Sequence, residues 1–177
     1  VGGDVSRLRA VAVTHTHIDR IKGLKTFLKN TNIPLIASRK TLCSLIESDS
    51  IPQNTKAFAV DEGAVNLGDI AIDFFETSHD AEGSGGYIIT LPDARRAAVC
   101  TDLGVMTDKI RQKLCGCEAV LIESNYDIEM LKCGPYPANL KLRIMSEQGH
   151  LSNNACAAEL PYLLKNGTTR ILLGHLS

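Results

Sequence analysis

The sequence predicts an α/β protein made of two mixed β-sheets flanked by helices. Runs with strand character alternate with runs of helical spacing along all 177 residues. The turn signal Pro92-Asp93-Ala94 joins two strand-like runs and indicates a hairpin, which a purely parallel sheet would not contain. The length suits one domain of ordinary size. We therefore expect a single domain over residues 1–177, and not a doubly wound parallel sheet.

In the first half of the chain, short apolar runs alternate with amphipathic segments. Leu24, Phe27 and Leu28 are at helical spacing, and Ser38 is a potential N-cap for a second helix. The turn signal Leu67-Gly68-Asp69 precedes the next strand. The expected elements are strands at residues 11–13, 33–37 and 70–77 and helices at residues 22–29 and 38–48.

The second half continues the same alternation. Thr107 is expected to cap a helix with Asp108 in its first turn, and Ser152 or Asn153 caps a later one. Pro161, near the end of that later helix, is an unfavourable residue there. The expected elements are strands at residues 86–91, 97–101, 119–124 and 170–173 and helices at residues 107–114, 127–131, 140–144 and 153–164.

Composition and charge exclude several classes of protein. The formal net charge is -1 and 44% of residues are hydrophobic, which is typical of a globular protein. The balance of charges gives no bulk positive field for nucleic acid. No apolar run reaches the roughly 18 residues that span a membrane, so no membrane partner is expected. One set of basic residues has two interpretations, a local basic patch or ordinary solvated helix faces. The set is Lys22, Lys25, Lys29, Lys132, Lys141 and Arg143.

The six cysteines are irregularly spaced, and several lie in apolar runs. A chain of this length does not need disulfides, so reduced thiols and a cytoplasmic location are expected. Cys115-Gly116-Cys117 has two interpretations: a soft-metal pair, or a helix that ends at Gly116.

All five histidines fall just beyond a predicted strand or just before a predicted helix. A single histidine in such a place is usually structural, but this interpretation is poor for all five. Loops at strand ends are where a rigid scaffold presents reactive groups. The five are His15, His17, His79, His150 and His175.

His15 and His17 are two residues apart, so on an extended segment both imidazoles reach one ion. Neutral imidazole is the commonest protein ligand for zinc-like metals, and carboxylates complete such sites. His79 and Asp102, each after a strand, would complete a tetrahedral set. The candidates for a second ion are Asp19 and His175, with Asp102 as a bridge.

Residues 14–23, THTHIDRIKG, resemble the Thr-His-x-His-x-Asp-His-x-x-Gly signature of the metallo-β-lactamase superfamily. A histidine, an aspartate and a terminal histidine then follow strands in that family's order. The segments SHDAEGSGGYIIT, CTDLG, IESNYDIEMLKCGPYPANLKLRIMSEQGHLSN and LLGHLS are similar to the bacterial YycJ/WalJ group of phosphodiesterase-like proteins. The resemblance covers essentially the whole chain.

This resemblance implies a four-layer αββα sandwich, the metallo-β-lactamase fold. Members of the family have a hairpin region before the first motif strand and further elements after the last histidine. The chain starts a few residues before that strand and stops two residues after His175. We therefore expect a single metallo-β-lactamase-like domain that is incomplete at both ends.

The resemblance also assigns the ligands. His15, His17 and His79 would bind one metal, Asp19 and His175 the other, and Asp102 would bridge. Most phosphodiesterase members have a second-metal histidine where this chain has Arg20. Arginine stays protonated and offers no lone pair, so we expect a second site that is weakened or completed by water. Decay of the gene is the alternative, although some β-lactamases also lack this histidine.

Two divalent ions, Zn, Mn or Fe, would share and activate a hydroxide, which Asp19 would orient. By resemblance, His150 would protonate the leaving group or hold phosphate, helped by Glu123. Ser152 lies just before a helix N-terminus that suits a phosphate; the alternative is that His150 only caps this helix. Tyr126 and Tyr136 are either base-stacking or ordinary packing residues.

The function expected from these features is metal-dependent hydrolysis of nucleic acid, and the resemblance implies a 5′→3′ exonuclease acting on DNA. One alternative is a hydrolase of small esters, thioesters or cyclic phosphodiesters on the same metals. Another is a degenerate regulatory metal-binding domain, which the arginine of the motif would favour.

Overall fold

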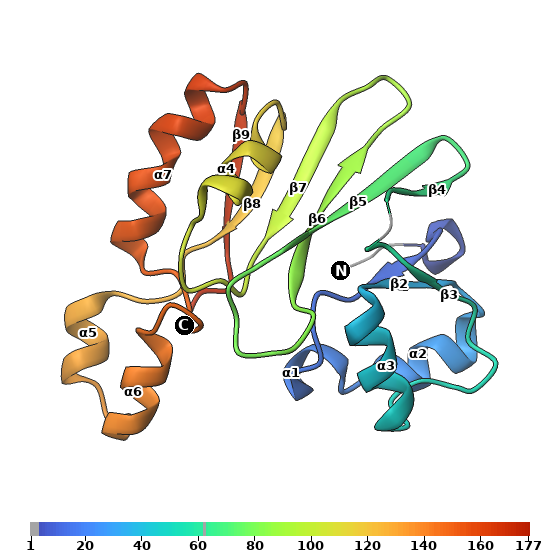
Figure 1. Ribbon diagram of the computed structural model, residues 1–177, viewed down its shortest axis with the longest axis horizontal. Coiled ribbons are helices and arrows are strands. Elements are labelled where there is room, and N and C mark those ends of the chain that lie inside the picture. The colour runs from blue at the N-terminus through green and yellow to red at the C-terminus, as the bar shows by residue number, and fades with distance from the viewer. Residues whose placement is uncertain (1–3, 62) are drawn as a thin grey trace.

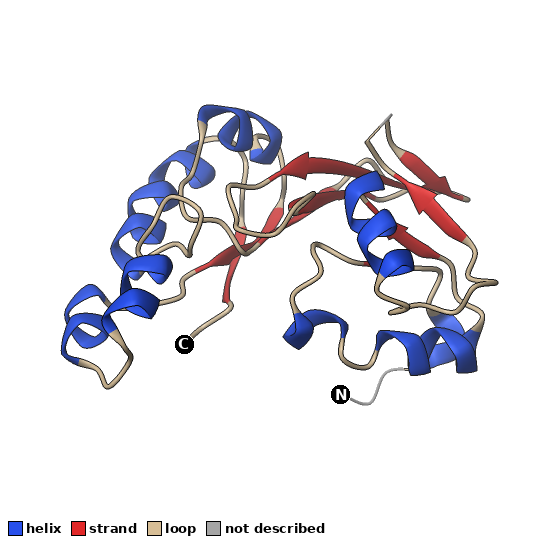
Figure 2. Ribbon diagram, turned by 60° about the horizontal axis from the view of Figure 1, so that its bottom comes forward, coloured by secondary structure: helices blue, strands red, loops and turns tan. Residues whose placement is uncertain are grey.

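The computed structural model describes residues 4–61 and 63–177, and within them the chain forms two β-sheets with helices on both outer faces (Figures 1 and 2). A short 3-10 helix, Val5–Arg7, precedes the first strand. The smaller sheet has the order β1-β2-β3 and is parallel throughout its described strands. These strands are β1 (Val11–Ala12), β2 (Leu35–Ala37) and β3 (Ala57–Ala59).

The larger sheet has the order β4-β5-β6-β7-β8-β9. Strands β4 to β7 pair antiparallel, whereas β7, β8 and β9 are parallel. This sheet is therefore mixed, as the sequence predicts. The smaller sheet was expected to be mixed as well, but its strands are parallel. Its strands are β4 (Val65–Leu67), β5 (Ile70–Glu76), β6 (Gly85–Thr90), β7 (Arg96–Cys100), β8 (Ala119–Glu123) and β9 (Arg170–Gly174).

The hairpin predicted at Pro92-Asp93-Ala94 joins β6 and β7. The Ala94 amide donates to the Leu91 carbonyl, and Ala94 is in the left-handed region with φ 64°. This tight turn is the local reason why β7 reverses direction before the parallel part of the sheet begins.

Seven α-helices connect and cover the described strands. In Figure 1, α2 and α3 lie beside the smaller sheet, and α4 and α7 lie beside the parallel part of the larger one. The helices are α1 (Ile18–Ile21), α2 (Leu24–Thr31), α3 (Arg39–Glu47), α4 (Asp108–Leu114), α5 (Ile128–Cys133), α6 (Ala138–Ile144) and α7 (Asn153–Lys165).

Three apolar clusters separate four layers. On β2, Leu35 packs with α2 and α3, whereas its neighbour Ile36 packs with residues of the larger sheet. On β6, Tyr87 belongs to that same middle cluster, and Ile88 packs with residues of α4 and α7. Successive strand residues point to opposite faces, so each sheet has one helix-covered face and one face toward the other sheet. The predicted αββα sandwich is confirmed.

Three helices begin at a residue whose side chain caps the N-terminus, as the sequence predicts. Ser38, Thr107 and Ser152 each accept a hydrogen bond from a backbone amide three residues later. Residues 18–21, by contrast, form an unexpected helical turn, so Asp19 and Arg20 are helical rather than in a loop. Strands β3 and β4 are also absent from the sequence prediction, because three residues are too short for a clear periodic pattern.

The cysteines are all free, which agrees with the expectation of reduced thiols. Cys115 ends α4, and Gly116 follows in the left-handed region with φ 76°. The helix-end interpretation of Cys115-Gly116-Cys117 therefore holds. Among the described helices, none combines the length and the apolar character that a membrane crossing requires.

Candidate metal centre

Three neighbouring parallel strands place side chains at one edge of the larger sheet. Asp102 follows β7, Glu123 is the last residue of β8 and His175 follows β9. Glu123 pairs with Gly174, the residue just before His175. Because the carboxyl ends of parallel strands meet at the same edge, residues far apart in sequence come together here.

Asp102 and His175 both have left-handed backbones, with φ 59° and 54°. Non-glycine residues rarely adopt this conformation, and it costs on the order of 1 kcal/mol or more. Both residues turn the chain sharply at a strand end, so that their side chains face the same site. This local strain is typical of functional positions.

The first ligand group consists of His15, His17 and His79, whose candidate ligand atoms all lie within 4.8 Å of one another. His79 Nε2 is 3.3 Å from His17 Nδ1, and His15 Nε2 is 3.9 Å from Asp102 Oδ1. Ligands about 2.0–2.2 Å from a zinc-like ion lie roughly 3–4 Å apart, so these separations fit one ion.

The buried His15 ring supports the same conclusion. Its Nδ1 contacts the Thr14 hydroxyl at 3.0 Å, whereas its Nε2 is buried without any hydrogen-bond partner in the described structure. Burial lowers the pKa of His15 to about 4 and also lowers that of His79. Both imidazoles are therefore neutral near pH 7, the form that binds a metal.

His79 is held in place by a backbone carbonyl. Its Nδ1 lies 3.1 Å from the carbonyl oxygen of Gly149, so that nitrogen carries the proton and Nε2 keeps its lone pair. This arrangement is the usual one for a metal-binding histidine, because the partner of the far nitrogen sets the tautomer.

The second ligand group consists of Asp102, Glu123, His150 and His175. Glu123 is fully buried and accepts hydrogen bonds from His150 Nδ1 at 2.9 Å and His175 Nδ1 at 2.5 Å. The backbone amides of Leu103 and Leu151 also donate to it, at 3.0 and 3.1 Å. Glu123 thus orients both imidazoles.

These bonds decide the charges in the second group. Burial alone would raise the pKa of Glu123, but the hydrogen bonds from His150 and His175 outweigh it and lower the pKa to about 2. In return, the bond to Glu123 raises the pKa of His175, against the opposite effect of burial. Glu123 is therefore a carboxylate, and His175 holds its proton more strongly than an ordinary histidine.

Arg20 lies on the carboxylate of Asp102. Its Nη2 donates to both Asp102 oxygens at 3.0 Å, and its Nε is 3.5 Å from Asp19 Oδ2. Burial would raise the pKa of Asp102, but His175, His15 and Arg20 together hold it below its usual value. Asp102 is consequently ionised between the two ligand groups.

The structure does not bring Asp19 into either ligand group. Its side chain is 63% exposed on α1. It lines a cavity of about 350 Å³ that His17, His150 and His175 also line, called here the histidine cavity. Asp80, by contrast, was missed from the sequence: its carboxylate is 3.3 Å from His17 Nε2 and 3.6 Å from His79 Nε2. It also pairs with Arg143 of α6. Its position directly after His79 was the available signal.

The other expected substrate contacts are placed differently. Ser152 caps α7 with its hydroxyl and is buried, so it supports the helix rather than offering a free group to a phosphate. His150 therefore does not cap the helix. Tyr126 and Tyr136 line a cavity of about 310 Å³ beside α5, and they do not line the histidine cavity. Glu123 is enclosed, and it is hydrogen-bonded to His150.

Both ligand groups contribute to a cavity of about 350 Å³. Its lining includes His17, His150 and His175 together with Leu140, Arg143 and Ile144 of α6. The cavity is thus bounded by candidate metal ligands on one side and by a helix on the other. Its dimensions suit the end of a chain or a small molecule.

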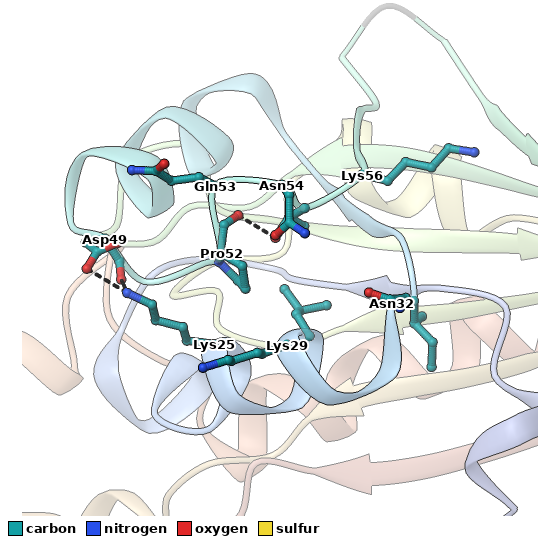
Figure 3. A pocket seen from close by; sticks show the side chains of 11 residues that line it. Lys25, Lys29, Asn32, Asp49, Pro52, Gln53, Asn54 and Lys56 are labelled. Carbon is teal, nitrogen blue, oxygen red and sulfur yellow. Dashed lines mark hydrogen bonds and ion pairs between the residues drawn. The ribbon is translucent and has the colours of Figure 1, made fainter.

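A larger cavity of about 660 Å³ lies away from the histidines, between α2 and the segment after α3. Figure 3 shows Lys25, Lys29 and Lys56 around it, with Lys25 paired to Asp49. None of the candidate metal ligands lines this cavity, so we assign no chemistry to it.

Three of the six residues in the candidate basic patch are paired with local acidic partners. Lys25 pairs with Asp49, Lys132 with Glu129, and Arg143 with Asp80. Of these, only Arg143 lines the histidine cavity. The solvated-face interpretation therefore describes most of this set better than a continuous basic groove.

A family model described as beta-lactamase superfamily domain matches residues 1–176. The chain is 34% identical over 176 residues to the exodeoxyribonuclease YycJ of Bacillus anthracis, covering 98% of this chain and 66% of that protein. It is also 34% identical over 173 residues to the exodeoxyribonuclease WalJ of Streptococcus pneumoniae serotype 2, covering 96% of this chain and 64% of that protein. The chain thus spans just under two thirds of the length of these relatives.

Two solved structures show the same fold at low sequence identity. A diphosphatase of the PhnP family superposes with a TM-score of 0.70 at 18% identity, covering 96% of this chain and 60% of that one. Zinc-bound PqqB from Methylobacterium extorquens superposes with a TM-score of 0.71 at 17% identity, covering 95% and 59%. Together with the family match, these likenesses confirm the resemblance predicted from the motif: the chain belongs to the β-lactamase superfamily domain family and has the metallo-β-lactamase fold.

Proposed function

We propose that this protein is a metal-dependent hydrolase that cleaves phosphodiester bonds of nucleic acid. The observation that carries the proposal is the buried, unpartnered His15 Nε2, which faces His17, His79 and Asp102 beside a substrate-sized cavity. A buried nitrogen without a partner is costly unless a ligand completes it. The likeness to two exodeoxyribonucleases adds the substrate class.

The residues present fit a divalent ion. His15, His17 and His79 would hold it, and Asp102 would supply the carboxylate between the two ligand groups. When bound, such an ion polarises a phosphoryl oxygen and lowers the pKa of water. Imidazole and carboxylate ligands suit Zn, Mn and Fe, so the ligand set does not select among the three.

His150 is the residue we assign to proton transfer at the leaving oxygen. Glu123 binds its Nδ1 at 2.9 Å, which fixes the ring and leaves Nε2 as the nitrogen that exchanges a proton. The ring centroid of His150 is 5.2 Å from that of His79, so it stands directly beside the first ligand group. Its side chain lines the cavity and is 21% exposed, which gives a substrate access to it.

The preferred substrate is DNA, attacked from a 5′ end. Arg143 would bind a substrate phosphate, since it lines the cavity. Its guanidinium would exchange the carboxylate of Asp80 for the phosphate. Asp19, which is exposed at the rim, would orient the attacking water. Tyr126 and Tyr136 would contact the nucleic acid only outside this cavity. The six free cysteines favour a cytoplasmic setting.

Hydrolysis of small esters, thioesters or cyclic phosphodiesters is the second candidate. The cavity of about 350 Å³ favours it, because that volume holds a small molecule as readily as a chain end. The formal net charge of -1, with Arg143 paired to Asp80, also gives little long-range attraction for a polyanion.

The proposal is tested by assaying the whole protein with Zn or Mn on 5′-phosphorylated single-stranded DNA and on a small thioester. We expect DNA hydrolysis that falls by about 100-fold or more in His15→Ala, which removes a ligand of the ion. Asn54→Ala, in the remote cavity, is the control and should keep full activity. Thioester cleavage without DNA cleavage would favour the second candidate. Metal binding without hydrolysis of either substrate would indicate a regulatory domain.

A further inference from the structure

Arg20 lies between the carboxylates of Asp102 and Asp19. One guanidinium nitrogen, Nη2, donates to both oxygens of Asp102 at 3.0 Å. A second nitrogen, Nε, is 3.5 Å from Asp19 Oδ2. The Arg20 side chain is 31% exposed, so it reaches inward from the surface helix α1.

The contact with Arg20 provides a positive partner for the buried carboxylate of Asp102. Its side chain is only 3% exposed, and a buried carboxylate is costly without a positive partner. His175 Nδ1 lies 3.3 Å and His15 Nε2 3.9 Å from its Oδ1. The same carboxylate therefore faces the first ligand group, the second ligand group and Arg20.

A guanidinium and a second divalent cation are mutually exclusive on these oxygens. Arginine remains protonated and has no lone pair, so it can only replace a cation and never bind one. Both oxygens of Asp102 already accept a hydrogen bond from Arg20, so a second cation on these oxygens has to displace the guanidinium. Asp102 can thus be shared by the first cation and Arg20, or by two cations after Arg20 has moved away.

We propose that Arg20 is a built-in competitor of the second cation, so that the two ligand groups fill in order. The group of His15, His17 and His79 fills first, with Arg20 on Asp102. A second cation binds Asp102 and His175 of the second ligand group only when Arg20 leaves. This inference rests on the metal site of the proposed function, but it does not depend on any substrate.

In the one-metal form, Arg20 supplies the second positive charge of the site. Its contacts with Asp102 and Asp19 use Nη2 and Nε, and a guanidinium has five donor hydrogens in all. The remaining donors suit a phosphate oxygen, because guanidinium geometry matches that group. Arg20 is thereby a positioning residue for both the carboxylate and an anionic substrate.

The test counts metal ions. The whole protein is stripped of metal, equilibrated with increasing free Mn²⁺ or Zn²⁺, and analysed for bound metal per chain. We expect one equivalent to bind first and the second to require at least about 100-fold more free metal, because the second ion must displace a fixed charge. Two equivalents that bind wild-type protein within about 10-fold of each other would overturn the inference, and this measurement needs no variant.

Two substitutions sharpen the test. Arg20→Ala removes the competitor, and Arg20→His replaces it with a ligand. Both should raise the affinity for the second metal ion by about 10-fold or more, and Arg20→His should raise it more. Lys22→Ala, two residues away, makes the same change of net charge and should leave the second affinity unchanged. An Arg20→Ala protein that behaves like Lys22→Ala would contradict the inference.

The outcomes separate this inference from the proposed function. Ordered filling without hydrolysis of any substrate would support the role of Arg20 and refute the enzymatic proposal. Equal filling with hydrolysis of DNA would do the reverse. Failure to bind any metal would overturn both.

Discussion

Glu123 shows how one buried residue controls several functional ones. Its two oxygens accept hydrogen bonds from His150, His175 and two backbone amides, all within 3.1 Å. Such carboxylate–histidine pairs orient a metal ligand and raise its basicity. Glu123, which is expected to help His150, thus holds both histidines in position.

The two ligand groups differ in their response to pH. Burial lowers the pKa of His15 to about 4, whereas the hydrogen bond to Glu123 raises the pKa of His175 above its usual value of 6.5. Protons compete with a metal only below the pKa of the ligand. Acidification from about pH 8 to about pH 6 should therefore weaken the binding of the second metal equivalent more than that of the first.

This prediction is checked by measuring bound metal per chain at several pH values in that range, at a fixed free-metal concentration high enough to fill both groups. Below the pKa of His175, the affinity of the second equivalent should fall by about 10-fold per pH unit. Loss of both equivalents at the same pH would contradict the assignment of separate groups.

At the scale of elements, the segment between α6 and α7 holds the site together. Gly149 packs so closely against the carbonyls of Arg143 and Ile144 that a Cβ atom has no space, and its own carbonyl receives His79 Nδ1. The end of α6 thus sets the position of a histidine that follows β5. Gly104, just after Asp102, packs equally closely against the backbone of Glu147.

Gly149→Ala should therefore damage both stability and metal binding. A Cβ atom would push the segment away from α6, at a cost of about 1–3 kcal/mol in the free energy of unfolding. Displacement of the His79 anchor should also weaken the first metal equivalent by about 10-fold.

Chemical denaturation and metal titration of the purified variant measure the two effects. Gly23→Ala is the control, because a Cβ atom there meets nothing within 4 Å. Equal denaturation midpoints for the Gly149 variant and the control would show that the segment has freedom to move.

At the scale of the whole molecule, Tyr87 joins the two sheets. Its hydroxyl, carried by β6 of the larger sheet, donates to the carbonyl of Val13 at 2.5 Å, with the Ile36 carbonyl at 3.4 Å. Both acceptors belong to the smaller-sheet side, and Val13 lies two residues before His15. Burial raises the pKa of the Tyr87 phenol, so the hydroxyl always carries its proton.

Tyr87→Phe keeps the ring but leaves a buried carbonyl without this donor. We expect a loss of about 1–2 kcal/mol in the free energy of unfolding and a smaller loss of affinity for the first metal equivalent. Chemical denaturation measures the variant against a control, Tyr162→Phe, because Tyr162 is a half-buried tyrosine of α7. A variant as stable as its control would mean that the sheets do not depend on this bond.

The positions of His15, His79, Asp102 and His175 could be predicted from the sequence. Each follows a short apolar run, and a strand with a polar residue just beyond its end is a local pattern. The hairpin and the capping serines and threonine are equally local signals, because a few adjacent residues decide them. Sequence alone thus determined the layered α/β fold and which side chains stand at strand ends.

The partners of those side chains were decided only by the tertiary structure. Arg20 and Asp102 are 82 residues apart, and Asp80 and Arg143 are 63 apart. Glu123 gave no sign of being enclosed, and the motif did not show that Ser152 is used as a cap or that Asp19 lies outside both ligand groups. Periodicity reports which face a residue occupies, whereas these contacts depend on how two sheets and their helices pack. That packing placed the guanidinium of Arg20 on the carboxylate of Asp102.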